Sequence, residues 1–309
     1  LIGISIGQLD FALLGALSDR FFGIISNDTL LAIPFFTLMG LVLERTGMAE
    51  DLLDTMGQLF GKMRGGLAYS VIFVGTMLAA TTGIVSASVI AMGLISLPIM
   101  LRYGYSKRIA SGVIAASGTL AQIVPPSLVL IVLGDQLGVS IGSMYKAALI
   151  PSALLIGAYI LFIFILTLVK PQSMPAIPEA ARTLHGTALA KKVVTSVIPP
   201  VTLIFLVLGT VFLGMATPTE AGAIGAVGAM VLALFKRSLT KKLLYQALDQ
   251  SVKITTFVVF IMIGSMFFSL AFTSLNGGIW IEGILGNLPG GVLGFIIAVN
   301  ILIFFVAFF

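Results

Sequence analysis

Hydroxyl-bearing residues and a glycine interrupt one of the long apolar stretches of this chain. Thr81, Thr82 and Gly83 stand together, and Ser86 and Ser88 follow with one residue between them. Broken backbone at membrane depth is tolerated only where it is buried in protein or lines a cavity. Such a break presents helix ends and free carbonyls, and hard cations prefer oxygen ligands. We therefore predict a Na⁺ site at this break, made by Thr82, Gly83, Ser86 and Ser88. The other glycines and the alanines of this apolar stretch are assigned to close helix packing instead.

A second interruption follows in the sequence SGTLAQIVPPS at residues 117–127. Tandem prolines remove two N–H donors and free carbonyls near Ala121 and Gln122. A binding site and a simple proline kink are equally compatible with this pattern. If it is a site, we expect the two breaks to face each other and to share a carboxylate substrate, since no intramembrane Arg or Lys is available to pair with it. Pro125 would then complete the ion site, and the substrate ligands would be Ser86, Ser117, Thr119, Gln122 and Ser127.

Enzyme chemistry has no visible basis in this sequence. We find no carboxylate pair, phosphate loop or catalytic triad, and the chain has no Cys and one His, His185, in a polar loop. We therefore expect no enzyme activity and no cofactor beyond Na⁺ as a coupling ion. Glu220 follows Thr217 and Pro218, which is the usual signature of a helix start, so a structural role is favoured over proton relay.

Composition predicts an all-α polytopic membrane protein. Hydrophobic residues make up 59% of the chain and charged residues 9%, with mean hydropathy +1.16, whereas soluble domains carry about 25% charged residues. The net charge of +5 does not indicate nucleic-acid binding, because the basic residues lie in short segments between apolar runs. The predicted apolar segments are 1–18, 22–43, 67–101, 109–133, 143–169, 193–216, 218–235, 254–275 and 291–309.

The apolar run Leu67–Leu101 is too long for one span, because about 20 residues cross the hydrocarbon. Placing all Lys/Arg clusters on the cytoplasmic side requires this run to begin and end on the same side. We interpret it as a re-entrant hairpin with its tip at residues 82–88, although two full spans satisfy the same charge count. The same count leaves residues 276–290 outside.

Two polar stretches, 44–66 and 238–253, show helical spacing of apolar residues. Each is compatible with an amphipathic helix at the cytoplasmic interface or with a connector packed on the bundle. A proline-containing loop from residue 171 divides the chain, and we predict a cytoplasmic loop over 171–192.

A shift of 224 residues places the segment 30–40 on 254–264, and charge gives these two segments opposite directions across the membrane. This predicts an inverted repeat, with residues 1–170 as the first copy and 193–309 as the start of the second, interrupted within its hairpin. Because both ends of the sequence lie within apolar segments, we interpret the chain as a fragment truncated at both ends.

The motifs LLAIPFFTLMG (30–40), PIMLRYGY (98–105), SGTLAQIVPPS (117–127) and ATPTEAGAIGA (216–226) resemble the large membrane subunit of tripartite ATP-independent periplasmic (TRAP) transporters. The resemblance covers essentially the whole chain. It implies an elevator-type secondary transporter in the bacterial inner membrane, which imports organic acids with a Na⁺ gradient. It also implies two protein partners, a periplasmic substrate-binding protein and a small four-helix membrane subunit.

Two other functions remain open from the sequence. One is a dicarboxylate or citrate symporter that works without a binding protein. The other is a channel or a structural membrane subunit, which is less favoured because the polar groups gather at two helix breaks instead of lining one path.

Overall fold

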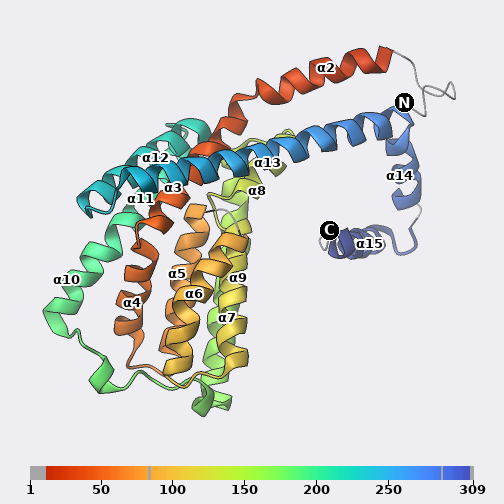
Figure 1. Cartoon of the computed structure of the whole chain (residues 1–309). Coiled ribbons are helices and arrows are strands. Elements are labelled where there is room, and N and C mark those ends of the chain that lie inside the picture. Colours follow the sequence, from red (N-terminus) through yellow and green to blue (C-terminus); the bar gives the residue numbers. More distant parts are fainter. Residues whose placement is uncertain (1–11, 83–84, 287, 307–309) are drawn as a thin grey trace. The chain divides into compact units, whose positions relative to one another are not determined.

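The computed structural model describes residues 12–82, 85–286 and 288–306, and within these residues it contains helices and connecting loops but no strand (Figure 1). The elements are α2 (Ala12–Ile25), η1 (Asp28–Leu31), α3 (Ala32–Arg45), α4 (Met48–Phe60), α5 (Gly66–Thr82), α6 (Val85–Arg102), α7 (Lys107–Thr119), η2 (Leu120–Gln122), α8 (Leu128–Gln136), α9 (Ile141–Val169), η3 (Pro171–Ser173), η4 (Glu179–Ala181), α10 (Gly186–Ser196), α11 (Ile198–Phe212), α12 (Pro218–Phe235), α13 (Lys241–Ser274), α14 (Gly277–Gly286) and α15 (Gly291–Val306). The prediction of an all-α membrane protein is confirmed at this level.

The chain forms two compact units, and the boundary between them falls within α13. One unit is Asn27–Thr256, and the other combines the remaining residues at the two ends of the chain. Among the described residues, four helical stretches are long and apolar enough to cross a membrane: 141–169, 186–212, 218–235 and 241–274. The larger unit holds both predicted helix breaks.

Helix α12 packs closely on α3 and α11 through one glycine face. A Cβ on Gly222 would lie 3.1 Å from Phe35 Cβ, and a Cβ on Gly225 would lie 2.6 Å from Met39 Sδ. Gly228 faces Leu203 in the same way. Because a side chain at these positions would collide with the neighbouring helix, the glycines allow the backbones to approach each other.

The start of α12 has the structural role that its sequence predicts. Thr217 Oγ1 accepts a hydrogen bond from the Glu220 N–H at 3.3 Å, and Glu220 Oε2 accepts one from the Thr217 N–H at 2.7 Å. These reciprocal bonds form a capping box with Pro218 in the first turn. Glu220 therefore stabilises the helix end.

Replacing Thr217 with Ala should lower the stability of the folded protein by about 1 kcal/mol, because the cap hydroxyl is lost. The melting temperature of the purified permease measures this loss. Thr195→Ala is the control, since its hydroxyl bonds only to carbonyls of its own helix. If Glu220 were instead a proton relay, Glu220→Gln would change the pH dependence of transport while leaving the melting temperature nearly unchanged.

Helix α4 is a connector packed on the bundle. Its apolar residues Met48, Leu52, Leu53 and Met56 are buried, and the last three belong to the core cluster that also contains Leu67. On its polar side, Asp51 pairs with Lys236 and Asp54 with Lys192. Of the two interpretations of residues 44–66, the structure therefore favours the packed connector, because the apolar face already contacts protein.

The connection between α9 and α10 ends at His185, earlier than the predicted loop 171–192, because α10 already begins at Gly186. The loop is also tied to the bundle. Met174 is buried, and its carbonyl accepts a hydrogen bond from the Gly65 N–H. The Ser173 carbonyl accepts one from the Ser106 N–H. The loop thus holds the two segments that flank the α5–α6 pair, instead of moving freely.

Two predicted boundaries are wrong. Residues 238–253 and 254–275 are not separate elements, because α13 runs without a break from Lys241 to Ser274 and contains no Gly or Pro between its two predicted parts. The apolar segments 1–18 and 22–43 are predicted to be separated at residues 19–21, but α2 continues to Ile25 and the gap lies at residues 26–27. There the Asn27 side chain caps η1 by accepting a hydrogen bond from the Thr29 N–H. Residues 276–290, which the charge count leaves outside, contain the short apolar helix α14, and their side of the membrane stays a prediction.

The inverted repeat stays a prediction, although the helix boundaries agree with it. The shift of 224 residues carries α5, residues 66–82, to residues 290–306, and α15 spans Gly291–Val306. Each of these helices follows a shorter helix, α4 or α14. The predicted domain limits, 1–170 and 193–309, likewise stay predictions.

Candidate transport site

Helices α5 and α6 form an antiparallel hairpin. The Leu67 N–H, at the start of α5, donates a hydrogen bond to the Tyr105 hydroxyl, three residues beyond α6, at 3.2 Å. The pair therefore begins and ends at the same side of the unit, and the helices have 17 and 18 residues. At 1.5 Å per residue each is about 25–27 Å long, slightly less than the hydrocarbon thickness of about 30 Å. The re-entrant interpretation is in keeping with these lengths and stays a prediction.

The predicted ion site lies at the turn of this hairpin. The described part of α5 ends at Thr82 and that of α6 begins at Val85, so Ser86 and Ser88, both predicted at the tip, already lie within α6. Gly83 and the side chains of Thr82 and Ser86 lie outside the described residues. Ser88 is described and is buried, with 1% of its surface exposed.

The second predicted break is present. α7 passes into η2 and ends, the Pro125–Pro126 peptide bond is cis, and α8 begins at Leu128. The Gln122 carbonyl accepts a hydrogen bond from Ser127 Oγ at 2.6 Å. The Ile123 carbonyl accepts one from Ser152 Oγ at 2.9 Å. Hydroxyl groups thus satisfy carbonyls at the break, and each carbonyl keeps a second lone pair.

The two breaks lie against each other within the larger unit. A Cβ on Gly118 would lie 3.0 Å from Val89 Cα and 3.1 Å from Val89 N, so α7 touches the backbone of α6 at its fifth residue. Helix α5 approaches α7 at the neighbouring residue, since a Cβ on Gly75 would lie 2.6 Å from Ser117 Cβ. These glycines let α5, α6 and α7 approach more closely than larger residues would allow.

A small apolar cluster joins the same elements. Ala79 of α5 and Leu120 and Ala121 of η2 are buried together, and Val85 at the start of α6 packs against them. The predicted juxtaposition of the hairpin turn and the proline break is therefore observed for the described residues. Ile156 and Tyr159 of α9 pack against the same cluster.

The polar residues of the second break divide into two groups. Ser117 is buried and donates to the Val113 carbonyl at 2.7 Å, and Ser127 is buried and bonded as described above. Thr119 and Gln122 are exposed, although Thr119 Oγ1 donates to the Ala116 carbonyl at 2.7 Å. In this conformation Ser117 and Ser127 bond to backbone carbonyls, whereas Thr119 and Gln122 reach the surface. Whether any of the four binds substrate stays a prediction.

Sequence reasoning missed Ser152 and the pairing of Gly118 with Val89. Ser152 follows Pro151 inside the longest apolar run of α9, and a polar residue at membrane depth is expected to face protein. That position could have drawn attention to Ser152. Nothing in the sequence names the partner of Gly118, because a glycine does not specify which backbone approaches it.

One family profile matches the chain from residue 4 to residue 309. Its description is "Tripartite ATP-independent periplasmic transporter, DctM component". The chain belongs to this family of TRAP transporter large membrane subunits. The predicted resemblance is confirmed, and with the apolar helices it identifies a multi-pass membrane protein.

Similar proteins include three curated TRAP large permeases that differ in their named substrates. The C4-dicarboxylate permease of Pseudomonas aeruginosa is 32% identical over 260 residues, which cover 84% of this chain and 59% of the relative. The 2,3-diketo-L-gulonate permease of Escherichia coli is 30% identical over 238 residues, which cover 76% of this chain and 54% of the relative. The sialic acid permease of Vibrio cholerae is 28% identical over 248 residues, which cover 80% of this chain and 56% of the relative. The chain thus spans between half and three fifths of the length of these TRAP permeases.

Proposed function

We propose that this TRAP chain is part of a secondary transporter that carries organic acids across the bacterial inner membrane, driven by a Na⁺ gradient. The observation that carries the proposal is the packing of two broken helices against each other in the larger unit. The names of the relatives support carboxylates as the substrate class, because C4-dicarboxylates, 2,3-diketo-L-gulonate and sialic acid all carry them.

The helix ends explain why such a site would suit a cation and a carboxylate together. α5 ends at Thr82 and η2 ends at Gln122, and helix C-termini present carbonyl oxygens and partial negative charge. α6 begins at Val85 and α8 begins at Leu128, and helix N-termini present N–H groups that bind anions. Na⁺ would bind at the hairpin turn with Pro125 nearby, and the carboxylate would take hydrogen bonds from Thr119, Gln122 and the hairpin turn.

We extend the proposal to the partners that the family implies. A periplasmic binding protein would deliver the substrate, and a small membrane subunit would brace the permease. The hairpin and the proline break would move together as one body in an elevator mechanism. The contacts between Gly118 and Val89 and between Gly75 and Ser117 support this joint movement, because they leave no space between the helices.

The test is uptake by liposomes that contain the complete permease with its membrane partner, with the binding protein added outside. Radiolabelled C4-dicarboxylate, sialic acid and 2,3-diketo-L-gulonate are the probes. We expect at least one to accumulate only with an inward Na⁺ gradient and with the binding protein present. Accumulation without the binding protein would favour the symporter alternative. Entry that only equilibrates, with no need for the gradient, would favour a channel.

A further inference from the structure

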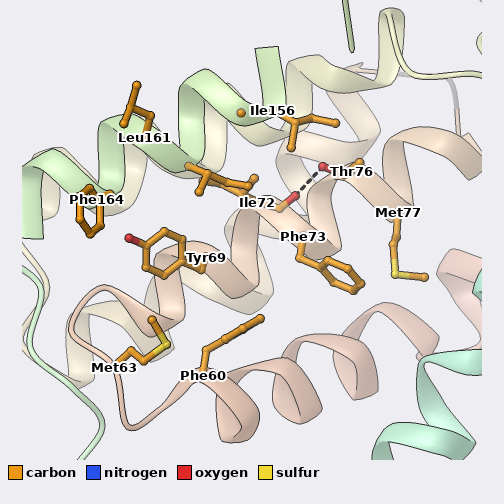
Figure 2. Close-up of a pocket in the computed structure, with 12 residues that line it drawn as sticks. Phe60, Met63, Tyr69, Ile72, Phe73, Thr76, Met77, Ile156, Leu161 and Phe164 are labelled. Atoms are coloured by element: carbon orange, nitrogen blue, oxygen red, sulfur yellow. Dashed lines mark hydrogen bonds between the residues drawn. The ribbon is translucent and has the colours of Figure 1, made fainter. Parts of the chain in front are cut away.

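An apolar groove lies on the larger unit, and Ile156 belongs both to its wall and to the cluster at the two helix breaks. The groove has a volume of about 620 Å³ and lies between α5 and α9, with the end of α4 beside it (Figure 2). Its walls include Phe60, Met63, Tyr69, Phe73, Ile156 and Phe164. Figure 2 shows these side chains around one space, with Met63 on the loop after α4 and the others on α4, α5 and α9. Among the described lining residues, Tyr69 and Thr76 carry hydroxyl groups. The Thr76 hydroxyl donates to the Ile72 carbonyl and so adds little polarity to the groove.

The groove has open space at one wall position. Gly157 of α9 lines it, and a Cβ built there would meet nothing within 4 Å. Phe73 and Tyr69 of α5 line the same groove. An apolar chain that filled the space would bury side chains that are otherwise accessible, and such burial is favourable.

One end of the groove is polar and basic. Met63 of the wall stands between Lys62 and Arg64, which are both exposed. The end of α9 lies beside this loop, because a Cβ on Gly65 would lie 2.7 Å from Thr167 Cγ2. Lys170 follows α9 directly and is also exposed. Three exposed basic residues therefore lie on the two segments that meet at one end of the apolar groove.

These three charges have no acidic partner among the described residues. Lys192 and Lys236, by contrast, pair with Asp54 and Asp51. By the distribution of Lys and Arg, this end of the unit is also the cytoplasmic side, where anionic lipid head groups attract basic residues. An apolar groove beside unpaired basic residues matches a molecule that has an apolar chain at one end and an anionic group at the other.

We propose that this groove binds an anionic phospholipid. One acyl chain lies along α5 and α9 between Phe60 and Ile156, and the phosphate contacts Lys62, Arg64 and Lys170. A transmembrane helix of a partner would fill the apolar part but would leave the three cations without a counter-charge. The proposal depends on the membrane location of the chain and does not depend on the proposed substrate or coupling ion.

Native mass spectrometry of the complete permease, incubated with phosphatidylglycerol or phosphatidylcholine, tests the proposal. We expect phosphatidylglycerol to be retained preferentially by the unmodified protein. Gly157→Leu should fill the groove and reduce this retention by about tenfold, because the acyl chain and the new side chain compete for one space. Lys62→Gln and Arg64→Gln should each weaken the preference about fivefold, as expected for the loss of one basic residue near a lipid surface.

Gly209→Leu is the matched control. Gly209 also lies in an apolar helix with nothing within 4 Å of its Cβ, and it is not part of the groove. Equal lipid retention by Gly157→Leu and the unmodified protein would overturn the proposal. Loss of the small membrane subunit from the Gly157→Leu complex, with lipid binding unchanged, would show that a protein segment occupies the groove. Absence of bound phosphatidylglycerol from the unmodified protein would overturn the proposal as well.

Discussion

Replacing Gly118 with Ala should reduce substrate uptake by roughly tenfold or more. A Cβ at this position would lie 3.0 Å from Val89 Cα and 3.1 Å from Val89 N, so the backbone of α6 must move away from α7. Backbone shifts of this kind cost about 1–3 kcal/mol, and 1.4 kcal/mol corresponds to a factor of ten. The measurement is the initial rate of Na⁺-driven uptake by liposomes, together with the melting temperature of the purified protein.

Gly112→Ala provides the control in the same helix. A Cβ on Gly112 meets nothing within 4 Å, and Ala is the better helix former, so neither uptake nor stability should fall. If Gly118→Ala transported at the normal rate, close contact between the hairpin and the proline break would not be required for function. A protein that melted normally but transported slowly would give the clearest support.

Removing a hydroxyl at the hairpin turn should weaken the coupling ion more than the substrate. We expect Ser86→Ala and Ser88→Ala each to raise the Na⁺ concentration for half-maximal uptake about tenfold, because polar contacts to charged groups contribute about 1.5–3 kcal/mol. The measurement is uptake at saturating substrate over a range of Na⁺ concentrations.

Ser111→Ala is the matched serine control for this series. Ser111 is exposed on α7, and its hydroxyl bonds to the Lys107 and Arg108 carbonyls of its own helix. Its removal should leave the Na⁺ dependence unchanged. Unchanged Na⁺ dependence in both hairpin variants would contradict the assignment of the ion site to this turn.

The positions of the helix breaks could be predicted from the sequence because Gly and Pro act locally. The change from α5 to α6 between Thr82 and Val85 and the break at Pro125 are each encoded within a few residues. The capping box at Thr217 is local in the same sense. The positions of helices with ambiguous amphipathic patterns were less predictable, since an apolar face does not tell whether lipid or protein covers it. Helix α4 is the example, because its face contacts the core cluster around Leu67.

The continuity of α13 was missed because charge suggested a boundary where the backbone has none. Lys253 lies between the polar and apolar parts of the helix, but a lysine does not interrupt helical hydrogen bonds. In the candidate site, the sequence predicted which elements meet but not the bonds that Ser117 and Ser127 make. Serine in a helix commonly bonds to a carbonyl three or four residues earlier, and this tendency explains Ser117. The bond from Ser127 to Gln122 depends on the shape of the loop and needed the structure.

The most direct test of a shared transport site is protection of a single cysteine by ligand. The printed sequence contains no Cys, so Thr119→Cys and Ala115→Cys, one turn apart on α7, can be introduced into a complete permease that is otherwise free of cysteine. In variants that still transport, Na⁺ together with a transported carboxylate should slow maleimide labelling at these positions and leave Ser111→Cys unaffected. Labelling rates at Thr119→Cys and Ala115→Cys that stay the same with and without both ligands would contradict a transport site at the two helix breaks.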